Sequence, residues 1–458
     1  MKQTLMLSAA LALGSLSSAA IAAESDYALI ERGHYISTAS DCVACHTTEG
    51  GAEFAGGKAI ETPLGEIFAP NITPSKTGIG SYTYEQFDAA VREGIRADGA
   101  HLYPAMPYTA YAKITDEDMK ALYAYFMQGV EPVEQASPES ELPFPFNIRL
   151  SMLGWNLLFL DGKPYQADSS KSDQWNRGAY LGEALAHCST CHTPRNLMMA
   201  EDRGQLLGGA SLGTWYAPNI SSDVNSGIGN WSEAEIVSYL KSGHADGKSQ
   251  AAGPMAEAIA HSLQHLNDED LQALAVWLKS VPAVSDAGDT QPADSHGQAL
   301  ADPDAVLMEP LPEDMADMSG AQLYEAACSS CHQADGTGAG GLPSLVNNTV
   351  LGRSNTDNLV MAILDGVKYR NEIKTSYGVD MLAFRNELSD AQIARVANYT
   401  LENFGRAEVA DISADEVAVL RNGGPASNLL PMARWGMGLG AAVVVLLLLV
   451  WVVRRRAK

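Results

Sequence analysis

Three stretches of the chain carry apolar residues at helical spacing, and this pattern predicts three equivalent helices. Each of these helices lies at the end of one of three successive blocks of sequence. These helices are Thr115 to Met127, Asn267 to Leu278, and Ser389 to Leu401. In register they carry an aromatic residue at matching positions: Tyr125, Trp277 and Tyr399. A period of this kind indicates tandem copies of one small domain and argues against a single large helical domain.

Each block also opens with a short predicted helix that contains a glycine: Gly33, Gly178 or Gly320. A glycine here would allow the opening helix to approach the closing helix closely. The first two blocks share further segments, since Ala69-Pro-Asn-Ile-Thr73 recurs as Ala217-Pro-Asn-Ile-Ser221. The third block is shorter and lacks this segment.

The two ends of the chain are apolar in different ways. Residues 1–22 have a charged start at Lys2, a short apolar stretch and a small-residue site at Ala20-Ile21-Ala22, the pattern of a cleaved secretory signal. Residues 435–453 contain no charge and are followed at once by three arginines. Such a run is long enough to span a bilayer, and the arginines mark its cytoplasmic side.

These patterns together predict a mainly α protein with three tandem domains and one C-terminal transmembrane helix. The expected domains are residues 24–135, 171–284 and 318–406. The segments around them are a signal peptide at 1–22, an apolar linker at 136–170, an acidic linker at 285–317, a juxtamembrane segment at 407–434, a transmembrane helix at 435–453 and a cytoplasmic tail at 454–458.

All six cysteines occur in Cys-x-x-Cys-His motifs, one in each block, and none is left over. The cysteines are Cys42, Cys45, Cys188, Cys191, Cys328 and Cys331, and the histidines are His46, His192 and His332. Two thiols three positions apart can bind the two vinyl groups of one haem, and the next histidine can then be an axial ligand of the iron. A thioredoxin-like pair, zinc sites or disulfides would leave the histidines or the odd number of pairs unexplained. The sequence therefore predicts three covalently bound haem c groups, a chemistry carried out outside the bacterial cytoplasm.

A methionine follows each motif at a similar distance and is the candidate sixth ligand. Met106 stands in Tyr103-Pro-Ala-Met-Pro-Tyr108, Met255 follows Gly253-Pro254, and Met381 precedes Leu382, so all three are expected in corresponding loops. Met361 competes with Met381, and His101 and His244 are alternatives in the first two blocks. Three closed His/Met sites would favour electron transfer over chemistry at the iron.

The linkers differ in character. The acidic linker has nine carboxylates between residues 285 and 318 and no Lys or Arg, which favours a solvated spacer over a mobile or partner-binding arm. The first linker is apolar from Leu142 to Leu160; it is expected to pack between the first two domains or to meet a partner or a bilayer surface. The whole chain has a net charge of −25, which makes nucleic acid an improbable partner.

The signal peptide, three Cys-x-x-Cys-His blocks, paired APNIT and APNIS segments and YPAMPY together resemble the triple-haem cytochrome c subunit of bacterial membrane-bound alcohol and gluconate (sugar-acid) dehydrogenase complexes. The resemblance covers the chain from about Asp26 to Phe404. Leu382 departs from it, because the family usually has proline after the third methionine.

This resemblance implies a non-catalytic subunit that passes electrons from a large dehydrogenase subunit, which carries FAD or pyrroloquinoline quinone (PQQ), to ubiquinone or a terminal oxidase. A small accessory subunit is a further expected partner. The cysteines named above would bind haem, and His46, His192, His332, Met106, Met255 and Met381 would be the axial ligands. The expected location is the periplasmic side of the bacterial inner membrane, with the C-terminus in the cytoplasm. Two alternatives are a free-standing membrane-tethered carrier and a haem enzyme with one exchangeable ligand.

Overall fold

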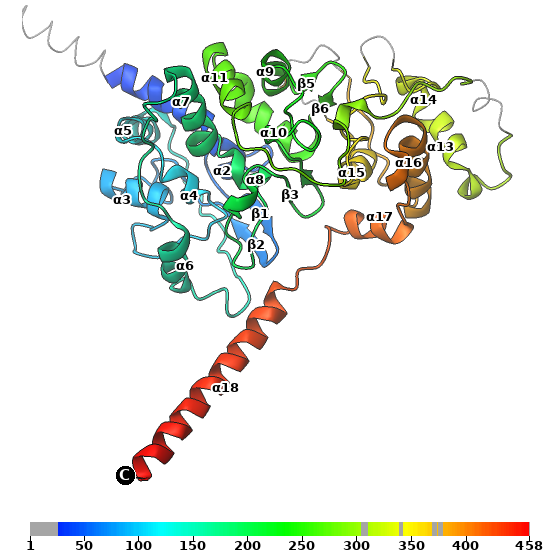
Figure 1. The fold of residues 1–458 in the computed structure, drawn as a ribbon. Coiled ribbons are helices and arrows are strands. Elements are labelled where there is room, and N and C mark those ends of the chain that lie inside the picture. Colours follow the sequence, from blue (N-terminus) through cyan, green and yellow to red (C-terminus); the bar gives the residue numbers. More distant parts are fainter. Residues whose placement is uncertain (1–25, 304–309, 339–341, 369–372, 374–378, 458) are drawn as a thin grey trace, which may run out of the picture.

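The computed structural model describes residues 26–303, 310–338, 342–368, 373 and 379–457, so the predicted signal peptide lies outside the described residues. Short helices make up most of the body, with three two-stranded antiparallel sheets. Figure 1 shows the first two repeats side by side, the third on their flank, and one long helix leaving the body. The mainly α class and the C-terminal apolar helix are confirmed.

The first repeat is helical over residues 26–39 and continues with α2 Cys42–His46, β1 Ala59–Thr62, β2 Gly65–Phe68, α3 Tyr84–Asp88, η1 Ala89–Glu93, α4 Tyr108–Tyr111, α5 Asp116–Ala124 and η2 Tyr125–Gly129. The second contains α7 Asp173–Tyr180, η3 Leu181–Leu185, α8 Cys188–His192, η4 Arg203–Gln205, β3 Ala210–Ser211, β4 Tyr216–Ala217, α9 Glu233–Ser242, β5 His244–Ala245, β6 Ser249–Gln250, α10 Gly253–His261, η5 Leu263–His265 and α11 Asp268–Leu278. The third contains α13 Gly320–Ala327, α14 Ser329–His332, α15 Asp357–Asp365 and α16 Asp390–Phe404. Outside the repeats lie α6 Ser151–Phe159, η6 Ala293–Ser295, η7 Met315–Asp317, η8 Ala407–Val409, α17 Ala414–Arg421 and α18 Leu429–Arg456.

In each repeat the opening helix crosses the closing helix at the predicted glycine. A Cβ added at Gly178 would lie 1.9 Å from the carbonyl oxygen of Ala273 on α11. At Gly33 and Gly320 the corresponding distances are 2.0 Å to Ala121 O and 2.5 Å to Arg395 O. The Cβ atom of the matching aromatic residue lies within 3 Å of each added Cβ position, namely Tyr125, Trp277 and Tyr399. The predicted close approach and the aromatic register are both confirmed.

The closing helices begin where their capping residues predict. Thr115, Asn267 and Ser389 each have extended backbone and accept a hydrogen bond from the backbone N–H three residues ahead, at Asp118, Asp270 and Gln392. A side-chain acceptor at this position satisfies one of the free N–H groups at a helix start. Local sequence therefore fixes where each closing helix starts, and with it the residues that face the opening helix.

The first two repeats interlock through reciprocal hydrogen bonds. The Tyr35 hydroxyl donates to Asp270 Oδ2 of the second repeat at 2.6 Å, and the Tyr180 hydroxyl donates to Asp118 Oδ2 of the first repeat at 2.6 Å. An arginine of the same repeat also binds each aspartate, through Arg32–Asp118 at 2.6 Å and Arg177–Asp270 at 2.6 Å. One continuous hydrophobic core spans both repeats. The two repeats therefore form one packed unit.

A buried carboxyl group lies at the same interface. Asp41, which directly precedes the first Cys-x-x-Cys-His motif, has a buried Oδ1 atom with no hydrogen-bond partner. Lys58 of the first repeat and Glu257 of the second repeat form a 2.5 Å ion pair nearby. Burial raises the pKa of Asp41 to about 8; the negative charge of Glu257 adds to this shift, and the positive charge of Lys58 opposes it.

The third repeat has its own core and is joined to the second by the acidic linker. Arg406 binds Asp289 Oδ1 at 2.7 Å, and Lys248 of the second repeat pairs with Asp294. Asn225 also donates to the backbone carbonyl of Asp289. The prediction of a solvated spacer is therefore wrong for this part of the linker, because its carboxylates pair with cations that are distant in sequence.

Beyond the third repeat the chain forms α17 and then α18. Ile412, Val417 and Leu420 are buried in the core of the third repeat. The apolar α18 has no buried residue, and it is the only helix in the described part of the chain that is long and apolar enough to cross a membrane. It begins six residues before the predicted span and runs into the three arginines.

Replacing Gly178 with alanine should destabilise the protein, because the added methyl group cannot fit between α7 and the backbone of α11. We expect a loss of about 1–3 kcal/mol in the free energy of unfolding, measured by thermal or urea unfolding of the haem-loaded protein. Gly154→Ala is the matched control, because Gly154 also lies in a helix but has nothing within 4 Å of an added Cβ. Equal stability of the two variants would contradict the assigned crossing.

Replacing Asp41 with asparagine should stabilise the protein increasingly as the pH rises. The folded-state pKa of Asp41 lies above its unfolded value, so between about pH 4 and pH 8 the folded state retains a proton that the unfolded state has lost. Stability due to this group therefore falls as the pH rises through that window. We expect the advantage of Asp41→Asn to grow by about 1–3 kcal/mol between pH 5 and pH 8 in urea unfolding. A pH-independent difference would contradict the assigned burial of the charge.

Candidate functional site

Each Cys-x-x-Cys-His motif forms one short helical turn directly after the opening helix of its repeat. Two motifs coincide with α2 and α8, and the third begins at Cys328, which caps α14. None of the six cysteines forms a disulfide. Burial raises the pKa of Cys42, Cys188 and Cys328 to about 12, so these thiols stay neutral. Two cysteines on one helical turn fit covalent attachment to the two vinyl groups of one haem.

The three motif histidines are held in the same way. The Nδ1 atom of His46 lies 2.7 Å from the carbonyl oxygen of Pro70, and His192 and His332 make the same contact with Pro218 at 2.6 Å and Pro343 at 2.9 Å. A carbonyl oxygen only accepts hydrogen bonds, so Nδ1 carries the proton and Nε2 keeps its lone pair. Burial also favours the neutral ring and lowers the pKa of His192 to about 4. Each histidine is thus oriented and kept neutral for metal binding.

These proline carbonyls give a role to the Ala-Pro-Asn-Ile segment, which occurs in the first two repeats. Pro70 and Pro218 are the prolines of the two matching Ala-Pro-Asn-Ile segments. Asn71 and Asn219, the next residues, fold these segments by accepting from the N–H groups two residues ahead. The third repeat lacks the segment and uses Pro343 instead. The repeated segment was therefore the signal for a histidine-orienting residue, but sequence reasoning did not assign it.

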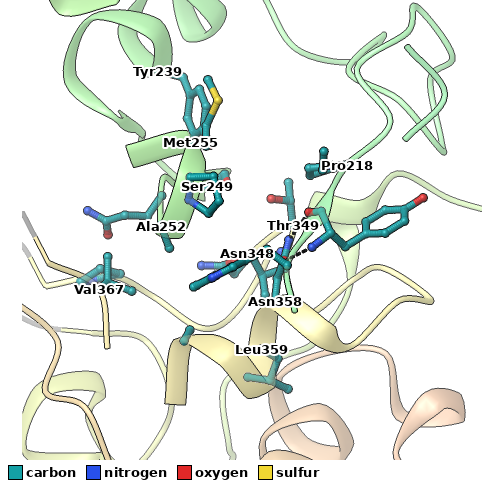
Figure 2. Close-up of a pocket in the computed structure, with 18 of the residues that line it drawn as sticks. Pro218, Tyr239, Ser249, Ala252, Met255, Asn348, Thr349, Asn358, Leu359 and Val367 are labelled. Atoms are coloured by element: carbon teal, nitrogen blue, oxygen red, sulfur yellow. Dashed lines mark hydrogen bonds between the residues drawn. The ribbon is translucent and has the colours of Figure 1, made fainter. Parts of the chain in front are cut away.

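The second and third motifs share one largely apolar cavity of about 430 Å³. The cavity is lined by both cysteine pairs, by His192 and His332, and by Met255 and Met381. Figure 2 shows Met255 and Tyr239 from the second repeat on one side and Asn358 and Leu359 from the third on another. The structure thus brings together two of the predicted sites and places the candidate methionines on the wall of the same cavity.

The methionines differ in how they are placed. Met106 lies in a turn, and Met381 pairs with Val367 in an isolated bridge. Met255 is instead in the first turn of α10, so the prediction of corresponding loops is wrong for this residue. The preceding Gly-Pro was taken as part of a loop, but proline is favoured in the first turn of a helix.

Two of the three competing ligands, Met361 and His244, are used elsewhere. Met361 is 2 % exposed and belongs to the core of the third repeat, and it does not line the cavity. His244 lies on β5, where its Nε2 atom contacts Asp246 Oδ1 at 2.6 Å. Both positions favour Met381 and Met255 as the residues available to the site.

Arg353 is a further cavity residue that sequence reasoning missed. It comes from the third repeat, and it donates to the backbone carbonyl of Ser226 in the second repeat at 2.9 Å. Burial lowers the pKa of its guanidinium group. A buried cation held by carbonyls can pair with an acidic group of a ligand in the cavity. No local pattern marks this residue, because its site lies in another repeat.

The first and second motifs also lie close together. Asp41, which directly precedes the first motif, lines the cavity that holds the second motif. The Tyr111 ring of the first repeat stacks edge-on against His187, which directly precedes the second motif, with ring centroids 5.5 Å apart. The second site is therefore flanked by the first on one side and by the third on the other.

Comparison with known proteins agrees with this geometry. The Cytochrome c family matches residues 30–129, 177–282 and 318–403, one match for each repeat. The chain is 46 % identical to the fructose dehydrogenase cytochrome subunit of Gluconobacter japonicus, over 94 % of this chain and 91 % of the relative.

Two further relatives are similar over nearly the whole chain. The cytochrome c subunit of the quinone alcohol dehydrogenase of Gluconobacter oxydans is 38 % identical, covering 93 % of this chain and 90 % of that protein. The gluconate 2-dehydrogenase cytochrome c subunit of Pantoea cypripedii is 39 % identical, covering 90 % and 94 %. With three matched domains, each built around a Cys-x-x-Cys-His turn that binds haem c, the chain belongs to the cytochrome c family and is similar throughout to the cytochrome subunits of dehydrogenase complexes.

Proposed function

We propose that this protein is the electron-transfer subunit of a dehydrogenase complex at the periplasmic face of the bacterial inner membrane. The observation that carries the proposal is the succession of three haem sites in one packed body that ends in an apolar helix. A large subunit with FAD or PQQ would oxidise the alcohol, sugar or sugar acid, and ubiquinone or a terminal oxidase would accept the electrons. Residues 1–22 would direct export, and Arg454, Arg455 and Arg456 would hold the C-terminus in the cytoplasm.

The residues of each site fit a closed haem c site with histidine and methionine as axial ligands. Cys42, Cys45, Cys188, Cys191, Cys328 and Cys331 would hold the haems covalently, and the ligand pairs would be His46 with Met106, His192 with Met255, and His332 with Met381. Each bound haem iron would carry one electron at a time. The proline carbonyls fix the histidine rings, the largely apolar cavity of the second and third sites would keep water from the haems bound there, and Arg353 would offer a positive charge to their acidic groups.

The contacts between the sites support a relay with the second haem in the middle. The second and third sites open into one cavity, which Asp41 beside the first motif also lines, and the Tyr111 ring of the first repeat lies against His187 beside the second motif. A linear order lets a two-electron donor pass its electrons on one at a time while the acceptor stays remote. The two rival functions, a free-standing carrier and a haem enzyme with an exchangeable ligand, use the same sites and differ in partner and in ligand lability.

Replacing Met381 with alanine should open the third haem iron to exogenous ligands. We expect Met381→Ala to bind carbon monoxide in the reduced state and to show a lowered midpoint potential for one of three haems, since loss of a methionine ligand lowers the potential. Met361→Ala is the control: it should cost about 2–5 kcal/mol of stability as a buried truncation but leave all three irons closed. Carbon monoxide binding by the unaltered protein would contradict three closed sites and favour the haem enzyme.

Purification from native membranes in mild detergent tests the assembly directly. We expect a large subunit with bound FAD or PQQ to co-elute with the three-haem chain, identified by mass spectrometry and cofactor extraction. Addition of the oxidised substrate class to that complex should reduce the haems, whereas the cytochrome chain alone should show no such reduction. Repeated elution of the chain alone would contradict the subunit assignment and favour a free-standing carrier.

A further inference from the structure

The nine-residue helix α6 in the first linker is largely apolar, with Ser151 and Asn156 as its two polar residues. On its inner side Trp155 is 8 % exposed; its ring lies edge-on to Tyr108 with centroids 6.2 Å apart, and its Nε1 atom donates to the Met198 carbonyl at 2.9 Å. Met152 and Phe159 belong to the same cluster. This side therefore fastens α6 to both of the first two repeats, and it accounts for the predicted packing between them.

The other side of α6 is exposed in the part of the chain that the structure describes. Leu153, Leu157 and Leu158 are 57 %, 86 % and 64 % exposed, and Leu150, directly before the helix, is 69 % exposed. Phe144 and Ile148 extend this surface along the preceding chain, at 53 % and 46 %. We call these six residues the outer apolar face. A contiguous exposed apolar patch of this kind marks a binding surface.

The outer apolar face is continuous with the start of the long C-terminal helix. The Arg434 side chain of α18 donates to the backbone carbonyl of Phe144 at 3.2 Å, across 290 residues of sequence. Figure 1 shows α6 on the side of the body from which α18 leaves. No residue of α6 is charged. Arg434 lies beside the face, whereas Arg149 is bound to the first repeat through the His101 carbonyl at 3.0 Å, and Asp161 follows the helix. An uncharged apolar surface beside the start of a long apolar helix suits the interfacial layer of a bilayer.

We propose that the outer apolar face is a membrane-contact surface that lies in the interfacial layer of the bilayer beside α18. This proposal rests on the proposed insertion of α18 in the membrane. A second attachment point fixes the orientation of the body, which a single spanning helix would leave free to rotate. Lipid is favoured over the dehydrogenase subunit as the occupant because the face adjoins the helix that enters the membrane.

The surface would also decide which haem site faces the lipid. Met106 packs in the same cluster as Tyr108 and Trp155, directly against the inner side of α6. The Tyr103 hydroxyl, at the start of the Met106 turn, donates to the Phe146 carbonyl at 2.8 Å. The first domain, through its methionine turn, is therefore the part of the relay held against the bilayer, where a lipid-soluble acceptor dissolves.

Photolabelling of the intact protein tests this surface. The haem-loaded full chain is reconstituted in vesicles of phosphatidylethanolamine and phosphatidylglycerol whose acyl chains carry a diazirine, illuminated, and analysed by mass spectrometry of its peptides. We expect acyl-chain label on the peptides that contain Leu150, Leu153, Leu157 and Leu158 as well as on α18. Val224, which is 55 % exposed on the second repeat, is the comparison site and should stay unlabelled.

A paired variant keeps the test specific. The double variant Leu153→Glu with Leu157→Glu should lose the label on α6 but keep the label on α18 and the haem absorption. The control Val224→Glu should keep both labels and the haem absorption. Label on α18 alone in the unaltered protein would overturn the contact surface and leave the anchor standing. Absence of label on both would overturn the anchor. Label on α6 that disappears in the native complex would assign the face to the dehydrogenase subunit and also overturn the proposal.

Discussion

The crossing of the opening and closing helices at a glycine is the contact on which each repeat depends. Because Gly33, Gly178 and Gly320 have no side chain, the two backbones meet where any larger residue would collide with a carbonyl oxygen. The Cys-x-x-Cys-His turn follows the opening helix directly, so this crossing positions the thiols and the histidine. The same constraint, used three times, gives three equivalent sites from three otherwise divergent stretches of sequence.

The repeats are joined in two different ways, and this asymmetry shapes the relay. Asp118 and Asp270 each bind an arginine of their own repeat and a tyrosine of the other, an exchange that resembles the reciprocal contacts of a twofold dimer. Among the described residues the third repeat makes no such exchange, and Arg353 and the linker carboxylates connect it to the second repeat. The first junction keeps two motifs adjacent through packed protein, whereas the second leaves a shared cavity between two sites.

Local patterns made most of the sites predictable. Cysteine spacing, the following histidine and the capping residues act within a few positions, so their roles can be read from the sequence. The crossing glycines act on a closing helix far along the chain, but they were visible because the same position recurs in all three blocks. The histidine-orienting carbonyls of Pro70 and Pro218 were missed because a backbone carbonyl has no residue type, although the repeated segment was visible. Arg353 and the partners of the acidic linker were missed because their contacts are made between repeats, at a separation that no local pattern records.

The chain that follows the third repeat brings the start of α18 back to the first linker. After the third repeat the backbone passes Gly424 against Gly213 of the second repeat, and then Arg434 reaches Phe144 in the first linker. The helix that follows the third domain in sequence therefore leaves the body beside the first. With the second site between the other two, this return places the far end of the haem series, at the third repeat, away from the proposed membrane surface. A donor subunit at the third repeat and an acceptor in the lipid would then use the full length of the relay, which gives three haems in series a physical purpose.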